Sequence, residues 1–80
     1  MKFLFHTVIM IETKPVYYNV HQVSNDRFYV ELLQNTNNVA GAVDFYLTVK
    51  NNEWVSSDES FARDGRAIGE DIETFLKNAV

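Results

Sequence analysis

The sequence lacks cysteine altogether and holds only one proline and three glycines among its 80 residues. Without cysteine, the chain has no disulfide bonds, no thiolate metal ligands and no thiol nucleophile. Its glycines, Gly41, Gly65 and Gly69, are isolated, so there is no glycine-rich phosphate-binding loop. Stability therefore has to come from an apolar core, and the 46% hydrophobic and 14% aromatic content is enough to build one.

Basic residues are also sparse. Seven Lys and Arg stand against eleven Asp and Glu, which gives a net charge of −4. The bases are scattered rather than clustered, so we expect no nucleic-acid partner. The apolar run Phe3–Ile11 is too short to span a bilayer and lacks a small-residue cleavage site, so we expect no membrane partner and no targeting signal. Together with the absence of cysteine, these features predict a cytoplasmic protein.

The clearest structural signal lies in residues 43–56. Apolar and polar residues alternate over residues 43–50, which is the pattern of a half-buried β-strand. Asn51-Asn52 tolerates positive φ, so we expect a two-residue hairpin turn at this position. Such a turn places Trp54 opposite Val49 on the apolar face of the hairpin.

Three further strands are expected before this hairpin, at residues 3–11, 16–23 and 28–34. For the first two we assume a two-residue loop at Thr13-Lys14, which pairs Ile9 with Tyr18 and joins their apolar faces. Strict alternation puts Phe3 on the face of Ile9 and Leu4 on the opposite face. Sliding the pairing by two residues keeps these faces, whereas a shift by one breaks them.

The C-terminal third changes to a helical period. One apolar stripe runs along it through Ile68, Ile72, Phe75, Leu76 and Ala79. Ser56 is a candidate N-cap, with Glu59 as its capping-box partner. The sequence leaves open whether residues 58–64 form a separate short turn of helix that Gly65 closes.

We therefore predict one α+β domain over residues 1–80: an antiparallel β-meander of four to five strands with a C-terminal α-helix packed on one face. The polar segment Asn35–Gly41 is expected to be its longest loop. Fold alone predicts no function for a small domain of this outline. The predicted core consists of Phe5, Ile9, Tyr18, Val20, Phe28, Val30, Phe45, Leu47, Trp54, Ile68, Ile72, Phe75 and Leu76.

Residues with catalytic or metal-binding chemistry are few. His6 and His21 are the only histidines, and the assumed loop places them opposite each other. Two imidazoles do not complete a metal site, and Glu31 approaches them only if strand order follows the sequence. The helical carboxylates fall on a predicted solvent face, and the serines lie in turns without a nearby histidine. We expect no catalytic residue, metal site or cofactor, and we do not expect an enzyme.

The sheet face opposite the predicted helix carries the strongest functional signal. One helix covers only one face of a sheet, and an outer face in contact with water is normally polar. Here it is rich in tyrosine, methionine and valine, of which the first two are enriched at protein interfaces. Tyrosine and valine also stabilise sheets without a partner, and that alternative stays open. The candidate interaction surface consists of Met10, Tyr17, His21, Tyr29 and Tyr46.

Three functions are compatible with these features. The first is a non-catalytic protein-interaction module that forms a homodimer or binds a protein partner through the helix-free face. The second is an acidic inhibitor or immunity-type protein that binds a basic partner, suggested by the net charge of −4 and the acidic residues around the helix. The third is a small-ligand-binding domain with a pocket between Trp54, the 35–41 loop and the start of the helix.

Overall fold

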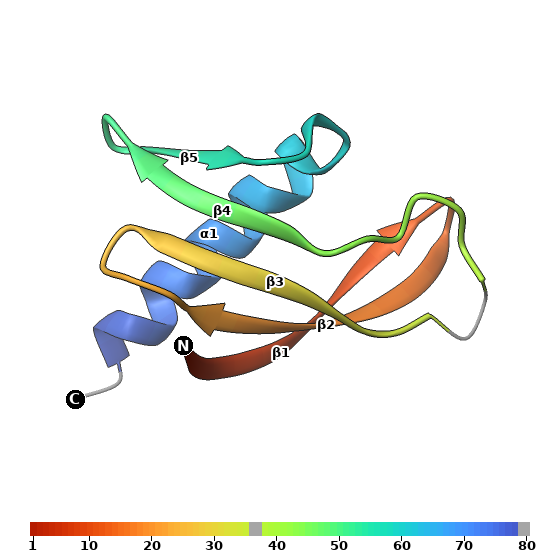
Figure 1. Ribbon diagram of the computed structural model, residues 1–80, viewed down its shortest axis with the longest axis horizontal. Coiled ribbons are helices and arrows are strands. Elements are labelled where there is room, and N and C mark those ends of the chain that lie inside the picture. Colours follow the sequence, from red (N-terminus) through yellow and green to blue (C-terminus); the bar gives the residue numbers. More distant parts are fainter. Residues whose placement is uncertain (36–37, 79–80) are drawn as a thin grey trace.

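Five antiparallel strands form one curled sheet, and a C-terminal helix lies across one of its faces (Figure 1). The computed structural model describes residues 1–35 and 38–78. Each strand pairs with the next one in the chain, so the sheet is a meander and the predicted α+β architecture is confirmed. The elements are β1 (Lys2–Ile11), β2 (Lys14–Gln22), β3 (Arg27–Gln34), β4 (Phe45–Lys50), β5 (Glu53–Ser56), the 3₁₀ turn η1 (Glu59–Phe61) and α1 (Ala62–Asn78).

The hairpin between β4 and β5 has the predicted turn. Asn51 and Asn52 both adopt positive φ, at 52° and 65°, which matches the twist of the flanking strands. Trp54 pairs with Val49 as expected. Val43 was predicted on the apolar face of this strand, but it lies before the start of β4 and is 44% exposed. Its carbonyl accepts a hydrogen bond from the Tyr18 hydroxyl at 3.1 Å.

The turn of the first hairpin lies one residue earlier than predicted. Glu12 and Thr13 carry the positive φ values, 52° and 65°, and the Thr13 hydroxyl donates to the Glu12 carbonyl at 2.5 Å. Ile9 therefore pairs with Val16 rather than with Tyr18. The pairing has slid by two residues, so the faces of β2, and of β1 from Phe5 onward, are those that alternation predicts.

An irregularity in β1 reverses the expected faces of two residues. The pairing with β2 shifts between Phe3 and Phe5, so Leu4 is the extra residue of a β-bulge. Leu4 is 6% exposed and belongs to the core, whereas Phe3 turns to the opposite face and is 46% exposed. Strict alternation assigned both residues to the wrong face, because it cannot anticipate an inserted residue.

The core lies between the sheet and α1. The Phe61 ring stacks on that of Phe45 at 4.4 Å between centroids and 5° between planes, which joins η1 to β4. Trp54 is partly buried and packs against this core. Its buried members are Leu4, Ile9, Val16, Tyr18, Val20, Phe28, Val30, Val39, Phe45, Leu47, Phe61, Ile68 and Ile72.

The far end of the helical stripe is not buried as predicted. Phe75 and Leu76 are 36% and 38% exposed. Figure 1 shows the C-terminal end of α1 extending past the start of β1, so the sheet does not cover the stripe there. Phe75 still touches the sheet through Phe5, with ring centroids 5.3 Å apart. Ala79, the last residue of the stripe, lies outside the described residues, as do residues 36–37 of the expected loop.

The helical segment begins with a cap that differs from the predicted one. Asp58 caps η1, and its Oδ1 accepts the Ser60 N–H at 3.0 Å. The Ser56 hydroxyl instead accepts the Asp58 N–H at 3.2 Å. Residues 59–61 form the 3₁₀ turn, and α1 follows directly. Within the described residues, no helix has both the length and the apolar character needed to cross a membrane.

Two glycines inside α1 allow the helix to approach β4 and β5 closely. A Cβ at Gly65 would lie 2.7 Å from Cδ2 of Leu47, and one at Gly69 would overlap the indole of Trp54. Gly65 therefore continues the helix instead of closing it, contrary to the alternative that the sequence left open. Its missing side chain serves packing here, although glycine weakens a helix.

Candidate interaction surface

The sheet face opposite α1, which we call the helix-free face, contains three groups of side chains. The first is an aromatic row that crosses four strands, formed by Phe3, His21, Tyr29 and Tyr46. The second is a polar row beside it, formed by His6, Asn19, Glu31 and Asp44. The third is an apolar patch beyond the polar row, formed by Val8, Met10, Tyr17 and Leu33.

The register places the members of the aromatic row directly opposite one another. Phe3 pairs with His21, His21 with Tyr29, and Tyr29 with Tyr46. Their ring centroids are separated by 5.8, 6.1 and 4.9 Å, respectively. The Arg27 guanidinium lies 4.2 Å above the centre of the Tyr46 ring, in cation–π geometry. His21, Tyr29 and Tyr46 of the predicted surface thus support each other across the sheet.

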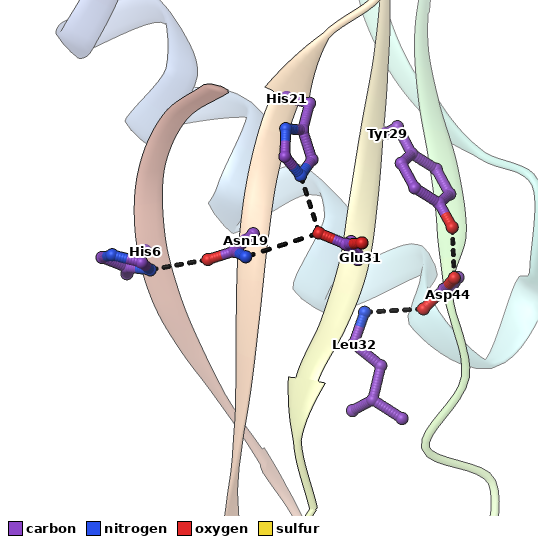
Figure 2. Close-up of polar contacts among 7 residues, drawn as sticks. All are labelled: His6, Asn19, His21, Tyr29, Glu31, Leu32 and Asp44. Atoms are coloured by element: carbon purple, nitrogen blue, oxygen red, sulfur yellow. Dashed lines mark hydrogen bonds and ion pairs between the residues drawn. The ribbon is translucent and has the colours of Figure 1, made fainter. Parts of the chain in front are cut away.

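The polar row is a chain of hydrogen bonds that links β1, β2 and β3 (Figure 2). His6 Nδ1 lies 2.6 Å from Asn19 Oδ1, and Asn19 Nδ2 donates to Glu31 Oε1 at 3.4 Å. His21 Nε2 contacts the same Glu31 oxygen at 2.9 Å. Hydrogen bonds from His21 and then from Asn19 hold the pKa of Glu31 below its ordinary value. These hydrogen bonds therefore favour the ionised form of the Glu31 side chain.

The two histidines do not face each other, contrary to the prediction. His6 pairs with Asn19 and His21 pairs with Phe3, because the earlier turn and the bulge at Leu4 both change the register. Since strand order follows the sequence, Glu31 does reach His21. Across residues 1–35 and 38–78, no group of three or more His, Cys, Asp or Glu side chains is arranged to hold a metal ion.

Asp44 joins Tyr29 of the aromatic row to the backbone of β3, a role that the sequence analysis missed. It accepts a hydrogen bond from the Tyr29 hydroxyl, and its Oδ1 accepts the Leu32 backbone N–H at 2.6 Å (Figure 2). The hydrogen bond to Asp44 raises the pKa of Tyr29 to about 12. The only advance signal was that alternation places Asp44 and Tyr46 on one face. Asp44 thus fixes the orientation of Tyr29.

The apolar patch remains open to solvent. Val8, Met10, Tyr17 and Leu33 are 49%, 57%, 42% and 52% exposed. Val8 pairs with Tyr17, and Leu33 lies at a second register shift between β2 and β3. Met10 and Tyr17 of the predicted surface are therefore its accessible members. His21, Tyr29 and Tyr46 are half-buried by their own row.

The described end of the 35–41 loop lies between the core and the end of β1. Val39 is buried in the core, where Asn35 holds it by hydrogen bonds of 3.0 and 3.1 Å to its N–H and carbonyl. Ala40 and Gly41 line a hollow with Met10 and Ile11 of β1 and with Phe61 near the start of the helix. Trp54 lines a different hollow, with Arg66 and Glu70 of α1 among its walls. Trp54 and the described end of this loop therefore line two separate hollows.

Another hollow lies at the end of the aromatic row. It is lined by Arg27 and Tyr46 on one side and by Val55 and Ser57 on the other, and it occupies about 440 Å³.

Comparison of this chain with protein-family models, with curated proteins and with solved structures finds no match.

Proposed function

We propose that this chain is a non-catalytic protein-interaction module that binds a protein partner through its helix-free face. The observation that carries the proposal is the apolar patch, whose four side chains lie together and are all accessible. A sheet face in contact with water normally consists of polar residues. A contiguous exposed apolar patch is typical of an association site. The aromatic and polar rows beside it are already ordered, which lowers the entropic cost of binding.

The distribution of charge supports contact through this face. Residues 57–78 carry six acidic and three basic side chains, a net charge of −3. The remaining five acidic and four basic side chains leave the rest of the chain with a net charge of only −1. The partner that fits the helix-free face therefore presents an apolar surface of its own, and binding is expected to depend weakly on salt.

The acidic inhibitor remains the second candidate, because the negative charge is concentrated in η1 and α1. A basic partner attracted to that side would be steered by long-range electrostatics. Its affinity would fall steeply as salt screens those charges. The salt dependence of binding therefore distinguishes the two functions.

The test uses immobilised chain to capture a partner from the cells that produce it, followed by affinity measurement on the purified pair. Tyr17→Glu combined with Leu33→Glu introduces two charges into the patch and should abolish binding. The matched control is Ala62→Glu combined with Ala67→Glu, which adds the same charge at exposed positions of α1. Tyr29 and Tyr46 are less suitable targets than Tyr17 and Leu33, because they hold the aromatic row together.

Loss of binding in the patch variant, with retention in the control and at high salt, supports the proposal. Binding that survives the patch variant contradicts it. A third outcome favours the acidic inhibitor instead. In that case the affinity changes in the control variant or at high salt, and the patch variant binds as the wild-type chain does. Circular dichroism of each variant establishes that the fold is unchanged.

A further inference from the structure

We propose that β1 is an association edge, through which two copies of this chain pair antiparallel into one continuous sheet. This surface is the backbone edge of the sheet and the groove behind it; it adjoins the helix-free face, because the side chains of Val8 and Met10 belong to the apolar patch. The inference therefore goes beyond the proposed function and does not depend on it.

Apart from the bulge at Leu4, β1 lacks the features that usually protect an edge strand. The sheet ends at β1 on one side and at β5 on the other. β5 has only four residues, and the close approach of α1 at Gly69 lies against it, whereas β1 has ten residues. Natural edges are blunted by short length, charged residues or proline. Between Phe3 and Ile11 the sequence has no Asp, Glu, Lys, Arg or Pro.

The turn at Glu12-Thr13 determines which backbone groups of β1 are free. In a two-residue hairpin the pair next to the loop, here Ile11 with Lys14, is a hydrogen-bonded pair. Bonded and non-bonded pairs then alternate along an antiparallel ladder, so the odd-numbered residues of the segment 5–11 bond to β2. The even-numbered residues direct their N–H and C=O groups away from the sheet. These residues are His6, Val8 and Met10.

The regular part of β1 is self-complementary about its midpoint, Val8. In a two-fold pairing centred there, Val8 lies opposite Val8 of the second copy and His6 lies opposite Met10 of the second copy. The outward N–H and C=O groups of these residues then bond across the junction. Pairing centred nearer the N-terminus would carry the bulge at Leu4 into the ladder and disrupt it.

The same register matches apolar side chains on the core side of the sheet. Phe5 and Ile11 are both only partly buried at the rim of the core. Pairing about Val8 places Phe5 of one copy opposite Ile11 of the other, so each covers the apolar side chain that the other leaves accessible. A second copy therefore fits this edge on both faces, and no charged side chain lies in the paired segment.

A groove behind the edge provides space for the incoming strand. A hollow of about 310 Å³ lies between β1 and α1, lined by Phe5, His6 and Thr7 on the strand and by Asp71, Thr74 and Phe75 on the helix. The apolar stripe of α1 continues beside it through Phe75 and Leu76, which the single chain leaves partly exposed. A strand added to β1 extends the sheet toward these two residues, which explains why the stripe continues past the sheet of one copy.

The first experiment measures solution mass by size exclusion with light scattering, up to millimolar concentration and at two salt concentrations. Wild-type chain is expected to form a dimer that is insensitive to salt. Val8→Pro removes an outward N–H without breaking a bond to β2, so it should give a folded monomer. The control is the Tyr17→Glu and Leu33→Glu variant, which should keep the dimer mass even though it loses the partner.

The second experiment follows amide hydrogen exchange in the wild-type chain by NMR. In the dimer, the amides of His6, Val8 and Met10 should exchange at least tenfold more slowly than in dilute monomer. The amides of Thr7 and Ile9 bond to β2 and should be protected under both conditions. This alternation identifies β1 as the paired edge, and it decides the question even if Val8→Pro fails to fold.

Three results would overturn the inference: a wild-type monomer at every concentration, a folded Val8→Pro variant that keeps the dimer mass, or a dimer in which the outward amides stay unprotected. None of them bears on partner capture by the helix-free face. Conversely, failure of the patch variant to lose a partner leaves the β1 dimer standing.

Discussion

Replacing Gly69 with alanine is expected to destabilise this protein, although the same change usually stabilises a helix. In an open helix, alanine is favoured over glycine by about 1 kcal/mol. At Gly69, however, the new Cβ would overlap three atoms of the Trp54 indole. The direction of the effect therefore depends on whether Trp54 lies against the helix as described.

The magnitude follows from what holds the indole in place. Trp54 Nε1 donates a hydrogen bond to Glu73 Oε1 at 3.0 Å, and its ring packs on Phe28 at 5.5 Å between centroids. Overpacking costs about 1–3 kcal/mol and a lost hydrogen bond about 1 kcal/mol. After the helical gain of about 1 kcal/mol is subtracted, we expect a net loss of about 1–3 kcal/mol in the free energy of unfolding.

The assay is chemical denaturation followed by circular dichroism. Glu70→Ala, at the neighbouring exposed position, is the control and should change stability by no more than about 0.5 kcal/mol. In a Trp54→Leu background, Gly69→Ala should recover most of its loss, because the atoms that it overlaps are gone. A stabilisation of about 1 kcal/mol by Gly69→Ala in the wild-type background would refute this reasoning.

Two further predictions concern η1 and the tyrosines. Phe61→Ala should cost about 3–5 kcal/mol in denaturation experiments, because Phe61 is buried and stacked on Phe45, and a cost below about 1 kcal/mol would contradict that packing. Burial raises the pKa of Tyr18 to about 12, and the hydrogen bond to Asp44 does the same for Tyr29. Because both values exceed the unfolded value of about 10, their contribution to stability is complete below pH of about 10 and is lost as the pH rises to about 12. Tyrosinate absorbance should show that these two tyrosines titrate above pH of about 10. Asp44→Asn should lower the pKa of Tyr29. A folded chain in which all four tyrosines titrate near the unfolded value would contradict both pKa predictions.

The faces of the sheet could be predicted because they depend only on a period of two. Alternation placed Tyr17, Tyr29 and Tyr46 on the face opposite the helix, and the turn at Asn51-Asn52 followed from its tolerance of positive φ. The turn at Glu12 and Thr13 was missed because neither residue has the marked preference of asparagine for that conformation. The error slid the pairing by two residues, which left the faces intact.

What could not be predicted depends on single residues and on tertiary packing. The bulge at Leu4 gives no local signal, yet it exchanges the faces of Leu4 and Phe3 and places Phe3 opposite His21. The roles of Gly65 and Gly69 become evident only when the helix is placed against the sheet. The residues of the candidate surface do lie on one face of the sheet, and their role in binding stays a prediction. Within this surface, Tyr29 and Tyr46 pack on each other, whereas Met10 and Tyr17 are accessible. This difference could be found only from the cross-strand register.

The meander order has a consequence for how this chain folds. Every strand pairs with its neighbour in sequence, so each hairpin closes a short loop and can form before the next one. The contact between Phe5 and Phe75 is different, because it joins the beginning of the chain to its end. During synthesis the five strands therefore emerge in the order in which they pair, and α1 emerges after them. Until the helix packs against the sheet, the apolar face that Ile68 and Ile72 cover is open to chaperones.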